Sequence, residues 1–182
     1  MQSVEPRIVS SRTVFSGRRV KLLIVNVALN EEIVEREVVD FGQAAAALPL
    51  IDDDTVILVE QYRSAVGGWI LEIPAGKVEP GEDPKECIVR ELEEEIGYRP
   101  RRVEKLVSVY TTPGYSNEVL HIFIARDLEY VGAHPEKYEL IRPRRMKLRE
   151  VIDMAKHGVV DAKTVLAVSL YLTMRTLQSR AP

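Results

Sequence analysis

The acidic segment of residues 76–98 constrains the fold of this chain more than any other feature. It reads GKVEPGEDPKECIVRELEEEIGY and holds seven glutamates and one aspartate. Pro84 suits a first helical turn, and Gly97 suits the position just past a helix end. Between them, apolar residues recur at helical spacing: Ile88, Leu92 and Ile96. The sequence therefore predicts a helix over residues 84–96, with one apolar face packed on a core.

Short β-rich runs lie on both sides of this helix. Residues 8–39 carry two such runs around a turn at residues 30–32, which predicts a small antiparallel section. Further strands are expected at residues 44–51, 55–62, 69–73, 103–111 and 118–128. Helices are expected at residues 148–157 and 161–177. The predicted fold class is α+β, with a mixed sheet, helices packed on it and a smaller β-rich section in front.

Composition narrows the class of protein. The chain has 182 residues, of which 46% are hydrophobic, so one globular domain with a sizeable core is expected. The net charge of −3 argues against a protein that coats nucleic acid. The basic run of residues 142–149 is interpreted as a solvated strand and helix entry, because no aromatic stacking residues are interleaved with it. A nucleic-acid partner is therefore not expected.

Cysteine usage and hydropathy set further limits. Cys87 is the only cysteine, which excludes an intramolecular disulfide and a zinc site built from several thiolates. It is interpreted as a small packed residue. No apolar run is long enough to span a bilayer, and the amino terminus lacks a signal-peptide core, so a cytoplasmic protein without membrane contact is expected. Few Asn and Gln beside many Glu, Arg and Val is typical of thermophilic proteins.

The predicted helix carries a candidate metal site. Glu91 and Glu95 stand one turn apart at the border of its apolar face, and Glu94 can reach Arg90. Two carboxylates so placed repel each other unless a positive charge lies between them. Mg²⁺ suits such oxygen ligands, and Mn²⁺ can substitute for it. The alternative is a solvated acidic helix with weak ion pairs.

The order of the whole segment decides between these two interpretations. It resembles the box of the Nudix hydrolase family, G-x5-E-x7-R-E-U-x-E-E-x-G-U, where U is a bulky apolar residue. Every fixed position matches, with Tyr98 as an aromatic at the last U. The resemblance implies a Nudix α/β/α sandwich, in which the box forms a loop, a helix and a loop that hold Mg²⁺ against a diphosphate.

The chain further resembles the ADP-ribose pyrophosphatase subfamily over about residues 12–177. The segments that carry this resemblance are REVVDFGQAAAALPL, VILVEQYR, WILEIPAG, TTPGYSNE and DAKTVLAVSLYL. Pro113 occupies the position associated with ADP-ribose specificity. The implied reaction is Mg²⁺-dependent hydrolysis of ADP-ribose to AMP and ribose 5-phosphate. Alternatives are another nucleoside diphosphate sugar, a dinucleotide, or a non-catalytic module that binds a nucleotide as a sensor.

The same resemblance implies roles for individual residues. The metal would be held by Glu91, Glu95 and the backbone carbonyl of Ala75. Other matched positions contact substrate: Arg63 and Arg36 at the diphosphate, and Glu72, Gly114 and Glu118 at the sugar and nucleotide. The alternative is that the two arginines are surface residues and that Glu72 and Glu118 are solvent-facing acids.

The resemblance leaves more than one candidate for the catalytic base. Relatives take a glutamate from an acidic loop, which here reads AHPEKYELIRP. The order of preference is Glu139, then Glu136, then Glu94.

Domain organisation and assembly also follow from the resemblance. Residues 1–40 would form a β-rich dimerisation section, and residues 41–182 the Nudix hydrolase domain. Relatives form homodimers that swap amino-terminal strands. In such a dimer, Arg36 would act on the substrate of the other subunit.

Overall fold

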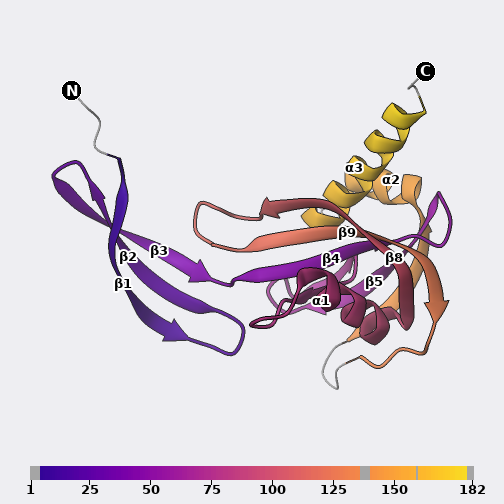
Figure 1. Ribbon diagram of the computed structural model, residues 1–182, viewed down its shortest axis with the longest axis horizontal. Coiled ribbons are helices and arrows are strands. Elements are labelled where there is room, and N and C mark those ends of the chain that lie inside the picture. Colours follow the sequence, from indigo (N-terminus) through magenta and orange to yellow (C-terminus); the bar gives the residue numbers. More distant parts are fainter. Residues whose placement is uncertain (1–4, 136–139, 159, 180–182) are drawn as a thin grey trace. The chain divides into compact units, whose positions relative to one another are not determined.

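The computed structural model describes residues 5–135, 140–158 and 160–179, which form two compact units. The first unit comprises residues 1–43 and 109–120, and the second residues 44–108 and 121–182. Figure 1 shows the course of the chain through both. Among the described residues, no helix is long and apolar enough to cross a membrane.

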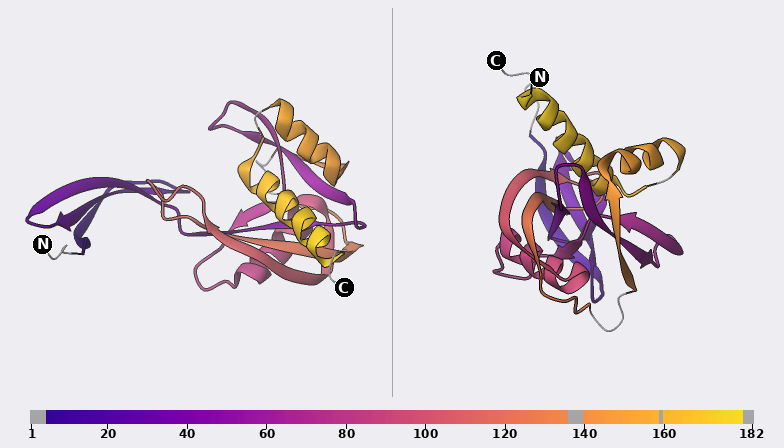
Figure 2. Two further views of the ribbon diagram at one scale, coloured as in Figure 1. Left: turned by 90° about the horizontal axis from the view of Figure 1, so that it is seen from above. Right: turned by 90° about the vertical axis from the view of Figure 1, so that its right-hand side faces the viewer.

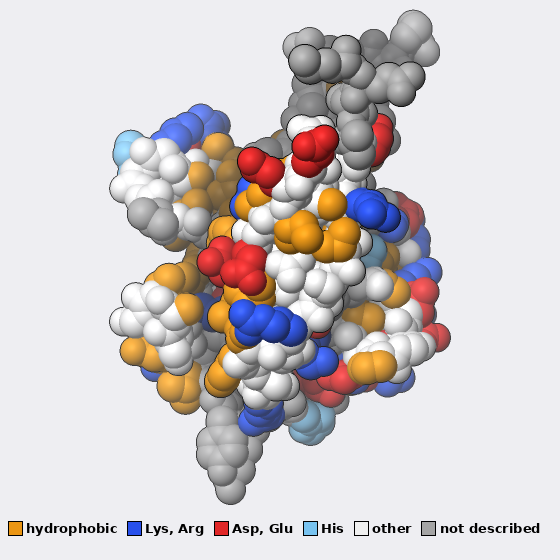
Figure 3. Space-filling model, turned by 90° about the vertical axis from the view of Figure 1, so that its left-hand side faces the viewer, with side chains coloured by type: hydrophobic (Ala, Val, Ile, Leu, Met, Phe, Trp, Pro, Cys, Tyr) orange, Lys and Arg blue, Asp and Glu red, His pale blue; other side chains and the backbone are white. Residues whose placement is uncertain are grey.

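The first unit is built on an antiparallel meander. Its strands are β1 (Arg7–Ser16), β2 (Lys21–Leu29) and β3 (Glu32–Asp40), paired in that order. Asn30, with a φ of 57°, makes the tight turn between β2 and β3 at the predicted place. Large apolar side chains of the meander reach the surface, including Ile8 and Ile33 at 71% and 68% exposure, and Figure 3 shows such apolar patches among polar atoms.

The turn at residues 112–115 belongs to the same unit and is attached to the end of β3. The Asn117 side-chain oxygen accepts hydrogen bonds from the N–H groups of Phe41 at 2.9 Å and Gly42 at 3.3 Å. The Asn117 amide donates to Asp40 at 2.7 Å. These bonds satisfy backbone donors that follow the strand, and they hold the turn against the meander.

The second unit contains most of the secondary structure. One sheet has the order β10-β5-β6 and another the order β7-β4-β9-β8. The strands are β4 (Gln43–Pro49), β5 (Thr55–Arg63), β6 (Gly68–Glu72), β7 (Ala75–Lys77), β8 (Tyr98–Tyr110), β9 (Val119–Tyr130) and β10 (Ile141–Lys147). The helices are α1 (Pro84–Glu91), α2 (Leu148–His157) and α3 (Ala162–Gln178), and a π-helical turn, η1 (Leu92–Ile96), follows α1.

Helices cover both sides of the strands in this unit. Figures 1 and 2 show α1 on one side of β4 and β9, with α2 and α3 on the other. The apolar face of α1 and η1 is buried against small residues of β4, Ala45 and Ala47, which let the helix approach closely. Other members of this core are Ile57, Val59, Cys87, Ile88, Leu92, Ile96, Phe123 and Ala125. The predicted α+β sandwich is confirmed, and the basic run forms β10 and enters α2 as expected.

Candidate active site

The predicted helix over residues 84–96 begins at Pro84 as expected, but its last five residues differ from the prediction. The Asp83 side chain caps the first turn by accepting a hydrogen bond from the Lys85 N–H at 2.8 Å. The predicted single helix is α-helical only to Glu91, and residues Leu92–Ile96 widen into a π turn closed from Gly97 to the Leu92 carbonyl. Such π turns often occur at functional sites. Because the turn is wider, Glu94 and Glu95 lie at other angles around the helix axis than they would in a regular α-helix.

Glu95 points into the protein and holds the start of β7. Its carboxylate accepts a hydrogen bond from the Ala75 N–H at 3.2 Å, and the residue is only 3% exposed. Ala75 is fixed in turn by pairing with Ala46 of β4. The carboxylate and the backbone at Ala75 therefore keep a constant separation.

Glu91 lies against the next residue of the same strand. A Cβ atom placed on Gly76 would come within 2.0 Å of the Glu91 Oε1 atom. Only glycine leaves room for that carboxylate. The side chains of Glu91 and Glu95 thus both lie against the Ala75–Gly76 segment, as a shared site with the Ala75 carbonyl requires.

These donors fit a hard divalent cation. Two carboxylates and one carbonyl suit Mg²⁺, which keeps several waters and takes few protein ligands. Within the part of the chain that the structure describes, no group of three or more His, Cys, Asp or Glu side chains is placed to hold a metal ion. Two carboxylates and one carbonyl would leave coordination positions for water and substrate oxygens.

Arg90 forms ion pairs with three carboxylates on the outer side of the box. Its guanidinium contacts Glu91 at 2.7 Å, Glu94 at 3.1 Å and Glu82 at 3.2 Å. Burial acts to lower the pKa of Arg90, but the hydrogen bonds and charges of Glu82 and Glu91 raise it overall. One cation thus serves three glutamates, and the predicted contact with Glu94 is confirmed.

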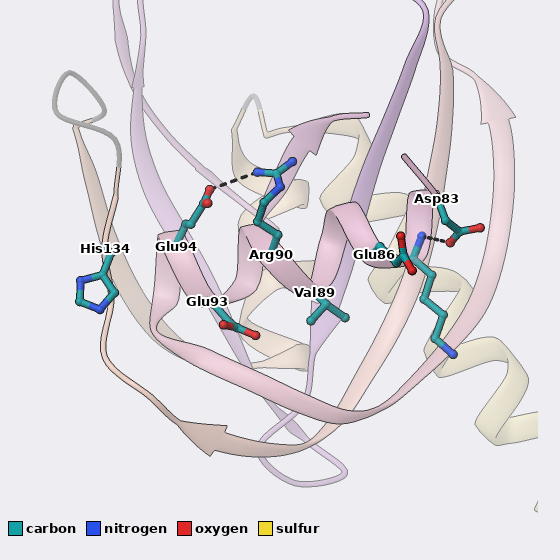
Figure 4. Close-up of a pocket in the computed structure, with 8 residues that line it drawn as sticks. Asp83, Glu86, Val89, Arg90, Glu93, Glu94 and His134 are labelled. Atoms are coloured by element: carbon teal, nitrogen blue, oxygen red, sulfur yellow. Dashed lines mark hydrogen bonds and ion pairs between the residues drawn. The ribbon is translucent and has the colours of Figure 1, made fainter. Parts of the chain in front are cut away.

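A cavity of about 730 Å³ lies along the exposed side of α1 and η1. Figure 4 shows its lining, with the Glu94 carboxylate turned toward Arg90. Val131 and His134 fix the chain beside it through backbone bonds from their N–H groups to Gly97 at 2.8 Å and Glu94 at 3.0 Å. At Gly97, whose φ is 75°, a Cβ atom would lie 2.6 Å from the Ala133 nitrogen, so this close approach also needs glycine.

A second ion-pair cluster lies at the ends of β5 and β6. Arg63 donates from Nε to the Glu72 Oε1 atom at 2.6 Å, and Lys163 pairs with Glu72 Oε2. Burial acts to lower the pKa of Arg63, but the hydrogen bond and charge of Glu72 raise it overall. Glu72 is 2% exposed, so it is not the solvent-facing acid of the alternative interpretation.

Lys163 is the residue of this cluster that the sequence analysis missed. It is separated from Glu72 by 91 residues, so no local spacing connects them. The available signal was Asp161, a helix cap residue ahead of the apolar run of α3, which places Lys163 in the first helical turn.

The other predicted site residues lie elsewhere. In the first unit, Arg36 is an exposed residue of β3 that donates to the Glu35 carbonyl at 3.0 Å. Gly114 is exposed in the turn, and Glu118 accepts a hydrogen bond from Thr111 at 2.5 Å. Glu136 and Glu139 lie outside the described residues.

Cys87 is a packing residue, as predicted. It is fully buried in the core, and burial raises the pKa of its thiol to about 12. A thiol with so high a pKa does not supply the thiolate that a cysteine nucleophile needs.

The sequence of this chain is similar to a known protein family. The model of the NUDIX domain matches residues 40–167, well over half of the chain. The chain belongs to the Nudix family. The matched residues include Glu91, Glu95, Gly76 and the two ion-pair clusters.

Two relatives of this Nudix protein match it almost end to end. ADP-ribose pyrophosphatase of Bacillus subtilis (strain 168) is 33% identical over 99% of this chain and 100% of its own length. Methanol dehydrogenase activator of Bacillus methanolicus is 37% identical over 94% of both chains. A crystal structure described as an ADP compounds hydrolase has the same fold, with a TM-score of 0.83, 23% identity and complete coverage of both chains.

Proposed function

We propose that this protein hydrolyses the diphosphate bond of ADP-ribose, releasing AMP and ribose 5-phosphate. The observation that carries the proposal is the placement of Glu91 and Glu95 against Ala75 and Gly76. The end-to-end similarity to an ADP-ribose pyrophosphatase supports the choice of substrate.

In the proposal, Glu91, Glu95 and the Ala75 carbonyl hold Mg²⁺, for which Mn²⁺ can substitute. Such an ion neutralises diphosphate oxygens and lowers the pKa of a bound water. Arg63 pairs with the diphosphate through its planar fork. Glu72, Gly114 and Glu118 line the sugar and nucleotide ends of the substrate.

A glutamate would orient or deprotonate the attacking water. We propose Glu139 for this role, ahead of Glu136 and Glu94. Glu94 comes last because its carboxylate is already paired with Arg90. Comparing Glu139→Gln, Glu136→Gln and Glu94→Gln by turnover rate assigns the role to the variant with the largest loss.

We also propose a homodimer in which residues 1–40 swap between subunits and residues 41–182 form the hydrolase domain. The exposed apolar side chains of β1 and β3 support a partner for the meander. In this dimer, Arg36 acts on the substrate of the other subunit. Sedimentation of the full chain tests the assembly, and a monomer at micromolar concentration would contradict it.

Product analysis tests the reaction. Purified protein is incubated with ADP-ribose, ADP-glucose, NADH, diadenosine polyphosphates and dGTP, with Mg²⁺ and again with a chelator. Metal-dependent release of AMP and ribose 5-phosphate, fastest from ADP-ribose, is expected. Faster cleavage of another compound would change the substrate, and tight binding without turnover would favour the sensor alternative.

The similarity to methanol dehydrogenase activator raises a second candidate function, which is activation of an alcohol dehydrogenase. It is tested by measuring a methanol dehydrogenase rate with and without this chain. An unchanged rate would remove this candidate and leave the hydrolase proposal intact.

A further inference from the structure

Glu72 is held by two cations in a place where water has little access. Its side chain is 3% exposed, with one carboxylate oxygen on Arg63 and the other on Lys163. A buried carboxylate is strongly destabilising when one of its partners is removed. Both cations therefore hold Glu72 in this position.

Lys163 reaches Glu72 because the first turn of α3 is attached to the end of β6. The Thr164 hydroxyl oxygen accepts a hydrogen bond from the Ile73 N–H at 2.8 Å, directly after Glu72 in the chain. Asp161 caps the same turn by accepting from the Thr164 N–H at 2.9 Å, and it pairs with Lys163 at 3.1 Å. The backbone around Lys163 is thus held by the bonds of Thr164, and its ammonium group is held by Glu72 and Asp161. The Lys163 side chain is 15% exposed.

Arg63 is held at only one of its nitrogens. Its Nε atom binds Glu72, while its terminal nitrogens have no hydrogen bond to any residue of the described ranges 5–135, 140–158 and 160–179. The side chain is one-third exposed, and the charge of Glu95 also acts on it. A guanidinium oriented in this way near a metal carboxylate can present two donors to a phosphate.

Among the groups joined by ion pairs in this cluster, positive and negative charges are equal in number. Arg63 and Lys163 carry two positive charges, and Glu72 and Asp161 carry two negative ones. Without Lys163, Glu72 would pull on Arg63 alone, and the free end of the guanidinium would move toward the second carboxylate oxygen. Lys163 occupies that oxygen, so Arg63 contacts Glu72 through its Nε atom alone.

We propose that Lys163 is a positioning residue for Arg63: by occupying the second oxygen of Glu72, it keeps the Arg63 fork turned toward the substrate diphosphate. This inference rests on the proposed function, in which Arg63 contacts that diphosphate. It adds a residue of α3, far away in the sequence, to the machinery that binds substrate.

Binding of α,β-methylene ADP-ribose with Mg²⁺, measured by titration calorimetry, tests the inference without any turnover. Lys163→Met is expected to weaken binding about tenfold, since coupled charge pairs carry interaction energies of this size. Lys163→Arg keeps the cation and restores most of the affinity. Lys156→Met, which breaks an exposed pair with Asp153 in α2, is the matched control and leaves the affinity unchanged.

A double-mutant cycle shows whether Lys163 acts through Glu72. The variant Lys163→Met/Glu72→Gln is expected to bind as weakly as the worse single variant, because Lys163 acts only through Glu72 and its loss has no further effect once Glu72 is neutralised. If the affinity losses of the two single variants multiply in the double variant, the inference is overturned, and Lys163 contacts the ligand directly. Wild-type affinity in a folded Lys163→Met protein would also overturn it, whereas no binding by the wild type would reject the proposed function itself.

Discussion

The two arginine-centred clusters of the second unit differ in charge balance. Around Arg90 gather three glutamates with side chains 13% to 37% exposed, so negative charge is in excess. Around Arg63, two acids meet two bases, and Glu72 is almost fully buried. The balanced cluster is complete without a metal. The unbalanced cluster lies where the Nudix box and the Ala75 backbone would place a cation.

The difference explains why counting carboxylates does not locate a metal site. Glu72 and Glu95 are equally inaccessible to water, at 2% and 3% exposure. Glu72 is matched by two cationic side chains, whereas Glu95 contacts a backbone N–H beside Glu91. Burial alone therefore does not separate a proposed metal ligand from a carboxylate held by ion pairs.

Removing a proposed metal ligand should have the largest effect. Glu95→Gln keeps an acceptor for the Ala75 N–H but loses a metal ligand, and the turnover of ADP-ribose should fall by about three orders of magnitude. Turnover is followed by AMP release, and the thermal midpoint shows whether the fold is kept. A folded variant with near-wild-type turnover would take Glu95 out of the metal site.

Moving a carboxylate without removing it should have the next largest effect. In Gly76→Ala the new Cβ displaces Glu91, and an error of about 1 Å in position costs roughly 100-fold in rate. The control is Gly68→Ala, because a Cβ there meets no atom within 4 Å. Equal rates for these two variants would show that the close approach at Gly76 has no role in catalysis.

The balanced cluster should show its importance in stability. Lys163→Met leaves buried Glu72 with one cation, and the free energy of unfolding should fall by about 2 kcal/mol. Arg90→Met breaks half-exposed pairs and should cost about 1 kcal/mol or less. Urea unfolding in the presence of a chelator measures both losses of unfolding free energy. A larger loss in Arg90→Met than in Lys163→Met would contradict the proposed difference between the clusters.

A smaller effect is expected in the pH dependence of stability. Burial acts to raise the pKa of Glu82, but the Glu79 N–H and Arg90 outweigh it and lower the pKa below 4.5. A lowered folded pKa stabilises the protein above the unfolded value, and this contribution is lost as pH falls through the folded value. The urea midpoint of Glu82→Gln should therefore fall less below pH 4.5 than that of the wild type. Parallel curves would show that Glu82 makes no such contribution.

Much of the fold could be predicted because its signals are local. The start of the helix at Pro84, its end before Gly97 and the alternating strands depend on short segments. The π turn at residues 92–96 could not be predicted, because its apolar residues have the spacing of an α-helix.

The candidate site divides in the same way. The contact of Arg90 with Glu94 follows from helical spacing, whereas the contact with Glu82 depends on how the preceding loop folds back. Lys163 reaches Glu72 only because α3 is attached to β6. Contacts made by tertiary packing leave no periodic pattern in the sequence.

Counting bound Mn²⁺ by electron paramagnetic resonance tests directly whether Glu91 and Glu95, and not Glu72, hold the metal. The wild type and Glu72→Gln should bind Mn²⁺ alike, while Glu91→Gln and Glu95→Gln should lose that binding. Unchanged Mn²⁺ binding in both Glu91→Gln and Glu95→Gln, or its loss in Glu72→Gln alone, would contradict the account.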